Sequence, residues 1–429
     1  MKNIAILDTL LGDNAKGHFA HYFSPNFDWA IRTSGSSNCG HVVYRDGKKY
    51  VHHLLPSGDY RVKGLKSFLG SGMYINLEEL LEEIKIAEED FPGVAKSIYV
   101  DPDAFTINDE HIAFDKAKNK HIGSTSKGVS PAATSKYART GARIYNYIND
   151  NAEVIQALKD LGVQFAPLLS LRETFERSRL LFEGNQGVLL DINSGIYPFV
   201  TTSDCTVSGI YASGFHFVKL DRVYGMMKPY LTKSGEGPLP SEYFGEEAED
   251  LRKRGGEFGN TTGRARRVGA LDLPMLKYGI RKGGMTHLII SKMDILSGQE
   301  RVKVCFDYGK EIHSPNDFTG VKPFYVELPG WKDAKDLTQV RPFIKHIEDY
   351  TNTKVEYIST GVENDDVINL NPPTLSDVFE NPEAGFIKYG DDLFSNVSTV
   401  DAATAAKLTT KENKFSLFDI MAKSKTKNV

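Results

Sequence analysis

Short apolar runs alternate along the chain with longer segments in which apolar residues recur at helical spacing. The run NIAIL, at residues 3–7, is continuously apolar, as in a strand buried on both faces of a parallel sheet. The segment AKGHFAHYF follows within a few residues and places Phe19, Tyr22 and Phe23 at helix-like positions. The start of the chain therefore predicts a strand, a glycine-containing turn and a helix.

The same alternation continues downstream. The segment NLEELLEEIKIAEEDF, at 76–91, predicts a helix that starts at an Asn76–Glu79 cap and has a solvated acidic face. Strands are predicted in SIYVDPDA (97–104), THLIISKMD (286–294), VKVCF (302–306) and VEYISTG (355–361), and RPFIKHIEDYTNT (341–353) predicts a helix. This order favours an α/β fold, in which a large, mostly parallel central sheet is flanked by helices.

The pattern also predicts the domain organisation. We find no internal repeat and no Gly/Ser-rich linker, so one large domain is expected over residues 1–370. Beyond about residue 370 the pattern fades, and the final MAKSKTKNV is polar and basic. Residues 371–429 are therefore expected to form a C-terminal extension.

Composition excludes several classes of protein. Hydrophobic residues are 40% and charged residues 25%, and the net charge of −4 gives no reason to expect a nucleic-acid or membrane partner. The three cysteines lack CxxC spacing, which argues against a disulfide framework or a zinc site. The chain has neither a leader pattern nor a run of about 18 apolar residues, so a cytoplasmic protein is expected.

The turn after the first strand, GDNAKG, is the first candidate site. The spacing between Gly12 and Gly17 excludes a Walker-type loop. Backbone N–H groups at the start of a helix still suit phosphate oxygens, with Lys16 as a point charge. Asp13 would repel phosphates unless it binds Mg²⁺ or accepts a proton, and an acidic turn beside a surface lysine explains the segment equally well.

Three further polar segments are weaker candidates. In NCGH, His41 is suited to donate a proton or hydrogen bond, although lone loop histidines are more often structural. The carboxamide of Gln186 can both donate to and accept from a base edge, or simply occupy a turn. The hydroxyl-rich HIGSTSKGVSPAATSKYART suits a phosphate as well as a surface loop, and Arg139 is expected on a helix there.

Two segments point to anionic and purine ligands. In EFGNTTGRARRVGALD, Arg264, Arg266 and Arg267 follow Thr-Thr-Gly, and arginine forks match carboxylates and phosphates. A solvated basic loop is the plainer interpretation. Asp294 ends a predicted strand, where a carboxylate can accept both N1–H and the 2-amino group of guanine but finds no such donor pair on adenine. ISTG, at 358–361, ends another strand and offers backbone groups to the same base.

In this order the segments resemble the adenylosuccinate synthetase family. The matches are GDNAKGH, NCGH, HHLLPSG, IGSTSKGVSPA with YAR, LFEGNQGVLLDINSGIYPFVTTS, GEGPLPSE, EFGNTTGRARRVGALD, SKMDILSG and ISTG, from about residue 4 to 365. The resemblance implies a homodimeric ligase of purine biosynthesis. GTP would phosphorylate O6 of IMP, and the amino group of L-aspartate would then displace phosphate to give adenylosuccinate.

The resemblance also implies residue roles. Asp13 would take the N1 proton of the purine and bind Mg²⁺ with the Gly40 carbonyl, while His41 and Lys16 would act on the phosphates. The implied acceptor and aspartate contacts are Asn38, Thr125, Arg139, Gln186, Thr201, Thr262, Arg264 and Arg266, with Arg139 reaching into the partner's site. The implied donor-nucleotide contacts are Gly12, Lys16, Gly17, Lys292, Asp294, Ser359 and Gly361.

Some positions depart from the family pattern, and two alternatives follow. Asn14, Ala15 and His18 replace a Glu-Gly pair and a second lysine, and Ser36-Ser37 replaces a Gly-His pair. One alternative is the viral branch that makes 2-aminoadenylosuccinate from dGMP, with ATP or GTP as donor. Members of that branch have a small residue at the catalytic aspartate, so Asp13 favours IMP. The other alternative is a non-catalytic nucleotide-binding relative, against which the retained candidate catalytic residues argue.

Overall fold

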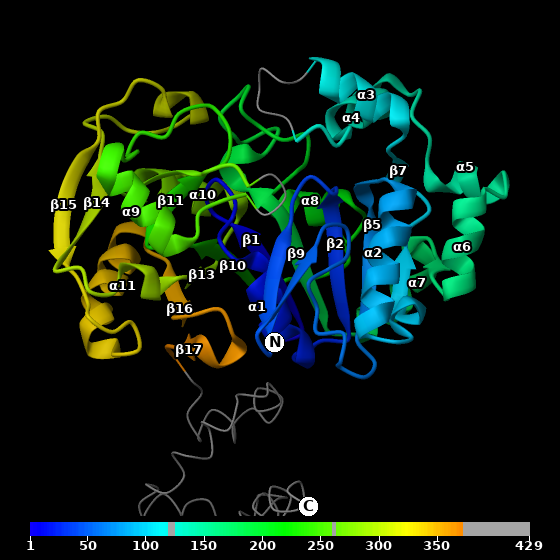
Figure 1. Cartoon of the computed structure of the whole chain (residues 1–429), viewed down its shortest axis with the longest axis horizontal. Helices are drawn as coiled ribbons and strands as arrows, with labels where there is room; N and C mark the ends of the chain where they lie inside the picture. The colour runs from blue at the N-terminus through cyan, green and yellow to red at the C-terminus, as the bar shows by residue number, and fades with distance from the viewer. Residues whose placement is uncertain (119–124, 260–262, 372–429) are drawn as a thin grey trace, which may run out of the picture. The chain divides into compact units, whose positions relative to one another are not determined.

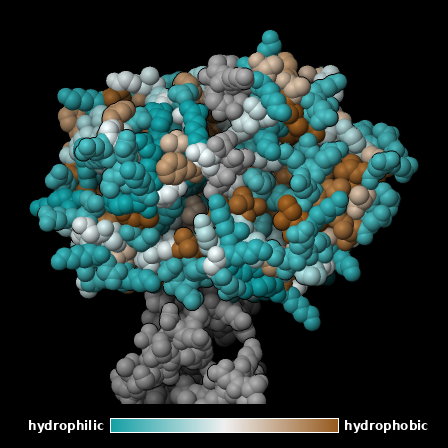
Figure 2. Space-filling model, viewed as in Figure 1, coloured by the Kyte–Doolittle hydropathy of each residue, from teal (hydrophilic) through white to brown (hydrophobic). Residues whose placement is uncertain are grey.

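The computed structural model describes residues 1–118, 125–259 and 263–371, which belong to one compact unit ending at Asn371 (Figure 1). The predicted C-terminal extension lies outside the described residues apart from Asn371, so the predicted domain division stays a prediction. Polar side chains cover most of the face shown in Figure 2, and the apolar residues on it form small separate patches.

An eleven-stranded sheet forms the centre of this unit, in the order β17-β16-β13-β10-β1-β9-β2-β5-β6-β8, with β7 beside β5. Every neighbouring pair is parallel except β16–β17, so the predicted α/β fold with a mostly parallel sheet is confirmed. The strands are β1 Asn3–Asp8, β2 Trp29–Gly35, β5 Lys66–Ile75, β6 Ile98–Val100, β7 Phe105–Thr106, β8 Gln164–Phe165, β9 Leu180–Gly187, β10 Arg222–Met227, β13 His287–Ile290, β16 Lys354–Ser359 and β17 Val367–Asn369.

Helices pack on both faces of this sheet. They are α1 Lys16–Phe23, α2 Leu77–Asp90, α3 Asp109–Lys118, α4 Val129–Ala138, α5 Ile144–Asn149, α6 Glu153–Leu161, α7 Leu168–Arg177, α8 Val207–Ala212, α9 Gly245–Gly255, α10 Leu273–Gly283 and α11 Leu337–Thr351. Ile4 and Ile6 of β1 share a core cluster with α1, whereas Ala5 and Leu7 share another with α8 and α10. Because both faces of β1 are covered, its apolar run is continuous.

The predicted helix at 76–91 is α2, and the Asn76 side chain accepts the Glu79 N–H at 3.0 Å as predicted. Its acidic face is not wholly solvated, because the Glu83 carboxylate accepts three backbone N–H groups of residues 53–55. The predicted helix at 341–353 is α11, which begins earlier, at Leu337, after a cap at Asp336. No helix within the described ranges is long and apolar enough to cross a membrane.

Two smaller sheets complete the unit. Four strands form one of them: β11 Tyr230–Lys233, β12 Arg267–Asp272, β14 Arg301–Asp307 and β15 Phe324–Pro329. The predicted strand at 302–306 is β14, and it belongs to this sheet, not to the central one. The other sheet is the hairpin of β3 His41–Arg45 and β4 Lys48–His52.

The topology places most of the predicted site residues at one edge of the central sheet. Carboxyl ends of parallel strands meet at the same edge, and ligands of open α/β sheets bind outside that edge. There β1 ends at Asp8, β9 at Gly187, β13 at Ile290 and β16 at Ser359. The segments that follow these ends carry the glycine turn, Lys292–Asp294 and Gly361.

Candidate active site

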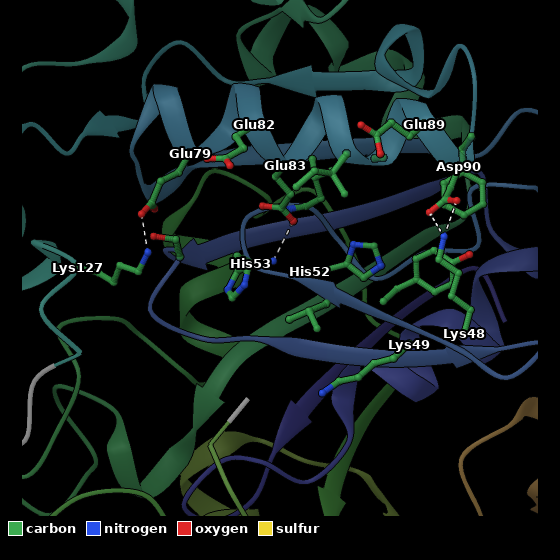
Figure 3. A pocket seen from close by; sticks show the side chains of 17 residues that line it. Lys48, Lys49, His52, His53, Glu79, Glu82, Glu83, Glu89, Asp90 and Lys127 are labelled. Atoms are coloured by element: carbon green, nitrogen blue, oxygen red, sulfur yellow. Dashed lines mark hydrogen bonds and ion pairs between the residues drawn. The ribbon is translucent and has the colours of Figure 1, made fainter. Parts of the chain in front are cut away.

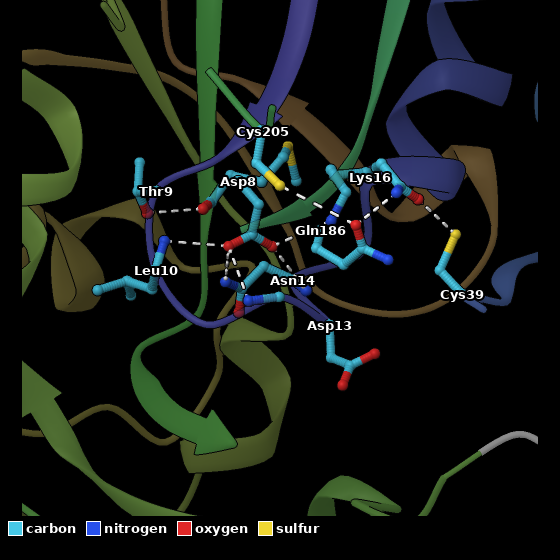
Figure 4. A network of polar contacts seen from close by, with 12 residues as sticks. Asp8, Thr9, Leu10, Asp13, Asn14, Lys16, Cys39, Gln186 and Cys205 are labelled. Carbon is cyan, nitrogen blue, oxygen red and sulfur yellow. Dashed lines mark hydrogen bonds and ion pairs between the residues drawn. The ribbon is translucent and has the colours of Figure 1, made fainter. Parts of the chain in front are cut away.

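Asp8, the last residue of β1, holds the glycine turn in shape. Its completely buried carboxylate accepts the backbone N–H groups of Leu10 at 3.0 Å, Gly12 at 3.2 Å and Asn14 at 3.3 Å (Figure 4). It also pairs with Lys16 Nζ at 3.2 Å. Sequence analysis missed Asp8, although an acidic residue ending a buried apolar strand was a visible signal. The predicted phosphate contacts Gly12 and Lys16 are thus engaged by Asp8 in this structure.

Asp13 points away from the Asp8 network (Figure 4). Its φ of 60° is in the left-handed region, and its side chain is 31% exposed. Oδ2 accepts a hydrogen bond from Ser234 Oγ at 3.1 Å and lies 3.1 Å from Nε of Arg266. That ion pair is not aligned as a hydrogen bond, and the buried Arg266 Nε–H has no hydrogen-bond partner among the described residues. A carboxylate and an unsatisfied arginine donor therefore face each other beside the turn.

Residues of β9 hold both ring nitrogens of His41, which lies at the start of β3. Its Nδ1 lies 2.5 Å from Glu183 Oε1, and its Nε2 lies 3.1 Å from the Asn185 carbonyl oxygen. Burial lowers the pKa of His41, but the charges of Cys39 and Glu183 outweigh burial and raise this pKa to about 9. The imidazole is therefore protonated at neutral pH. Sequence analysis missed Glu183, whose position in the quoted FEGNQG run was its only signal.

Cys39 and Gly17 complete the surroundings of His41. Burial raises the pKa of the Cys39 thiol, but the Arg32 guanidinium and His41 lower this pKa to about 6. Arg32 is itself completely buried and reaches Cys39 Sγ at 3.2 Å. A Cβ atom at Gly17 would lie 3.0 Å from His41 Cβ, so glycine at this position lets α1 pack against the histidine.

Asn38 and Gln186 also meet at this edge. Gln186 Nε2 donates to Asn38 Oδ1 at 3.1 Å, which joins the predicted acceptor contacts from two segments far apart in sequence. The side-chain oxygen of Gln186, Oε1, accepts a hydrogen bond from Asn185 Nδ2. Thr201 is half-buried, and its backbone N–H donates to the Leu190 carbonyl oxygen at 2.7 Å.

The arginine segment contributes one buried and one exposed side chain. Arg266 is only 7% exposed, and its NH1 group donates to Glu257 at 2.8 Å. Arg264 is exposed and pairs with Glu236 at 2.9 Å. Thr262 lies outside the described residues. The segment is thus more than the solvated basic loop that the sequence also allowed.

The predicted donor-base residues lie together after β13 and β16. Asp294, in the short 3₁₀ helix Met293–Leu296, has a buried Oδ1 atom with no hydrogen-bond partner among the described residues, and burial raises its pKa. The Ser359 hydroxyl accepts the Lys292 N–H at 3.2 Å. A Cβ atom at Gly361 would lie 2.1 Å from the Asp366 carboxylate, so any other residue there would have to displace that carboxylate. An unsatisfied carboxylate oxygen suits the donor pair of guanine.

Two predicted residues lie apart from this group. The side chains of Thr125 and Arg139 are exposed, and neither forms a hydrogen bond or ion pair with the site residues above in the part of the chain that the structure describes. Arg139 was predicted on a helix, but it follows the end of α4 and has a left-handed φ of 65°.

A cavity of about 560 Å³ lies between the β3–β4 hairpin and α2 (Figure 3). Its walls carry charges of both signs, including the pairs Lys48–Asp90 and Lys127–Glu79, each at 2.6 Å. No predicted site residue lines this cavity. It is therefore separate from the group around Asp13.

Comparisons with known proteins identify the family of this chain. The sequence profile described as adenylosuccinate synthetase matches residues 5–171 and 149–368. Adenylosuccinate synthetase of Petrotoga mobilis is 38% identical, over 88% of this chain and 99% of its own. That of Thermotoga maritima is 36% identical, over 86% of this chain and all of its own.

Solved structures show the same fold. Fully ligated adenylosuccinate synthetase from Plasmodium falciparum superposes with a TM-score of 0.77 at 28% identity, covering 86% of this chain and all of its own. The cyanophage S-2L succinoaminodeoxyadenylate synthetase bound to dGMP and dATP gives a TM-score of 0.64 at 20% identity, covering 90% and 99%. At that identity the second likeness concerns the fold alone.

Proposed function

Because the chain belongs to the adenylosuccinate synthetase family of C–N bond-forming ligases, we propose that it ligates L-aspartate to IMP and uses GTP. The reaction would pass through 6-phosphoryl-IMP. The observation that carries this proposal is the Asp13 carboxylate, which lies outside the Asp8 network and 3.1 Å from Arg266 Nε. This proximity supports a base that acts beside an arginine suited to an amino-acid carboxylate.

In the first step Asp13 accepts the N1 proton of IMP, and electron density moves onto O6. O6 then forms a bond to the γ-phosphorus of GTP, the bond from this phosphorus to the bridging oxygen breaks, and GDP leaves. Protonated His41 exchanges the contact of its Nε2 with the Asn185 carbonyl oxygen for the phosphoryl oxygens and donates a hydrogen bond to them as charge develops. Glu183 supports this role, because it keeps the imidazole protonated and fixes its ring.

In the second step the amino group of L-aspartate forms a bond to C6 of 6-phosphoryl-IMP, the C6–O6 bond breaks, and phosphate leaves with the proton that the amino group loses. Thr262, Arg264 and Arg266 bind the aspartate carboxylates. The Arg266 Nε–H supports this assignment, because it is a buried donor without a hydrogen-bond partner among the described residues, and a ligand oxygen would satisfy it.

The acceptor nucleotide is contacted by residues from three regions. Asn38 and Gln186 contact the purine side of IMP, and their mutual hydrogen bond fixes both amides beforehand. Thr125 and Thr201 bind the 5′-phosphate. Arg139 serves the site of the partner subunit in a homodimer, which agrees with its exposed position in one subunit and with the 80% exposure of neighbouring Tyr137.

The donor nucleotide lies along the ends of β1, β13 and β16. Gly12, Lys16 and Gly17 contact its phosphates, so Lys16 exchanges its bond to Asp8 for a phosphate contact or extends to both. Asp294 accepts from guanine N1–H and the 2-amino group. Lys292, Ser359 and Gly361 line the same base site.

The donor set also suits Mg²⁺. Asp13 and the Gly40 carbonyl are hard oxygen ligands, and the described residues contain no group of three or more His, Cys, Asp or Glu that could cage a metal alone. This fits a Mg²⁺ ion that takes one or two protein oxygens and completes its shell with phosphates and water. When bound, it would offset the repulsion between Asp13 and the phosphates.

One experiment tests the function directly. Purified protein is given IMP or dGMP, each with GTP or ATP, L-aspartate and Mg²⁺, and the products are identified by mass. We expect adenylosuccinate from IMP with GTP. A product from dGMP alone would identify the 2-aminoadenylosuccinate reaction instead, and nucleotide binding without any product would identify a non-catalytic relative.

A further inference from the structure

The side chain of Glu257 is completely buried next to the candidate site and contacts four polar groups. Oε1 accepts hydrogen bonds from Lys228 Nζ at 3.0 Å, Lys292 Nζ at 3.0 Å and the Tyr230 hydroxyl at 2.6 Å. Oε2 accepts from the NH1 group of Arg266 at 2.8 Å. One carboxylate therefore satisfies three cationic groups and one hydroxyl.

These partners come from separate parts of the fold. Lys228 directly follows β10, and Lys292 lies two residues after the end of β13, so both extend from the central sheet. Arg266 precedes β12 and Tyr230 begins β11, in the four-stranded sheet. Glu257 itself lies just after α9. Its carboxylate thus connects the two sheets at the point where the proposed aspartate and donor-nucleotide contacts, Arg266 and Lys292, emerge.

The charges require a carboxylate at this position. Lys228 is also completely buried, and burial lowers its pKa to about 8 against the raising effect of Glu257. Burial alone would raise the pKa of Glu257, but Lys228, Lys292 and Arg266 together hold it well below its usual range. Glu257 therefore stays ionised. Without its charge, three cations would repel one another in a site with little water to screen them.

Arg266 is held differently by its two carboxylate neighbours. Its contact with Glu257 is an aligned, charge-assisted hydrogen bond, whereas its 3.1 Å contact with Asp13 is an ion pair without hydrogen-bond alignment. Asp13 is also the proposed base and must turn to the purine. Glu257 takes no part in the chemistry, so it can keep Arg266 in place while Asp13 changes partner.

We propose that Glu257 is a positioning residue that fixes Arg266 for the amino-acid substrate and Lys292 for the donor nucleotide. One buried carboxylate thereby sets the geometry of two substrate sites. The inference rests on the proposed function, since it assigns these two partners to aspartate and GTP.

The test is the isosteric Glu257→Gln variant, which removes the charge and little volume. We expect the KM values for aspartate and GTP each to rise about 10- to 100-fold, the effect of losing a charge-assisted hydrogen bond. The KM for IMP should rise less than these two values, because Glu257 contacts neither Asn38 nor Gln186 and reaches the purine only indirectly, through Arg266 and Asp13. A purely structural residue would lower the active fraction, and so kcat, without this selective pattern.

Glu242→Gln is the matched control. Glu242 pairs with Arg267, the arginine next to Arg266, and supports the same end of β12 without touching Arg266 or Lys292. All three KM values should stay unchanged in this variant. Equal rises of the KM values in Glu257→Gln and Glu242→Gln would show that losing either carboxylate near the start of β12 has the same effect. That result would overturn the proposal.

A double variant, Glu257→Gln with Lys228→Met, separates the effect of Glu257 on the position of Arg266 from its effect on the balance of buried charges. Removing one charge of each sign should recover thermal stability, while the KM for aspartate stays raised because Arg266 still lacks its partner. If Glu257→Gln alone does not fold, the KM values are measured on this double variant instead. Normal KM values in either variant would overturn the proposal. Failure of the wild-type protein to form adenylosuccinate would instead refute the function on which the proposal rests.

Discussion

Lys16 Nζ lies 3.2 Å from the Asp8 carboxylate, and both side chains are buried. The pair joins the end of β1 to the first turn of α1 across the glycine turn. Asp8 also binds three backbone N–H groups of the same turn, so the turn keeps one shape through a single residue.

Asp8→Asn should destabilise the protein by about 3 kcal/mol or more, because it leaves the Lys16 charge buried without its partner. The free energy of unfolding, measured in urea, checks this. Asp349→Asn is the control, since Asp349 pairs with Lys345 at the exposed surface and should cost less than about 0.5 kcal/mol. Equal losses in the two variants would contradict the assigned role of Asp8.

Asp13→Asn should lower kcat by about 10²- to 10⁴-fold, the usual contribution of a general base, while IMP and GTP still bind. Asparagine tolerates the left-handed backbone at this position, so the loss would reflect the carboxylate alone. Asp46→Asn provides a control with φ of 52° and an exposed side chain, and it should retain full activity. A near-normal rate for Asp13→Asn would refute the assigned base.

Asp294→Asn should reduce the preference for GTP over ATP, expressed as a ratio of kcat/KM values, by at least about 100-fold. The reason is that an amide cannot accept two hydrogen bonds from guanine as a carboxylate does. Kinetics with both donors at fixed IMP and aspartate measure the ratio. If the preference does not change, the base site lies elsewhere.

Arg139→Leu should weaken IMP binding if two subunits share each site. Mixing this variant with Asp13→Asn by unfolding and refolding should restore about a quarter of wild-type activity, because half of the dimers would contain one intact site. The measurement compares the activity of the mixed sample with the activity of each variant alone. No recovery in a heterodimer verified by mass would count against sharing.

The protein should lose stability between about pH 6.5 and pH 4. Burial lowers the pKa values of His18 and His21 to about 4 and that of His52 to about 3. Over this range the unfolded chain binds protons that the folded protein does not, so the free energy of unfolding falls as pH falls. Each histidine contributes up to about 3 kcal/mol.

Urea unfolding at pH 7, 5.5 and 4.5 measures this dependence. His52→Gln should make the loss on acidification smaller, and His313→Gln, at an exposed position, should not. The same pH dependence in wild type and His52→Gln would show that other groups cause the acid sensitivity.

Local pattern was enough to predict several elements. The apolar run of β1 and the spacing and cap of α2 are fixed by burial and hydrogen bonds within a few residues, so both were found. Membership of β14 in the smaller sheet was not predicted, because strand pairing joins residues far apart in sequence. The quoted motifs identified most of the site candidates, and the resemblance supplied their roles.

The supporting carboxylates were harder to find. Glu183 meets His41 across 142 positions of sequence, and Glu257 meets Lys292 across 35. The FEGNQG run around Glu183 is a weak signal, and the immediate neighbours of Glu257 do not distinguish it from an ordinary surface acid. Their importance comes from burial beside cations, which becomes visible only when the chain is folded.

The Asp8 network has a consequence for how a nucleotide arrives. One carboxylate already holds the backbone of this turn in a single conformation. An incoming phosphate therefore binds backbone that was ordered during folding, and binding does not have to order it. Association of the nucleotide with the turn should then be fast, with little loss of backbone conformational entropy.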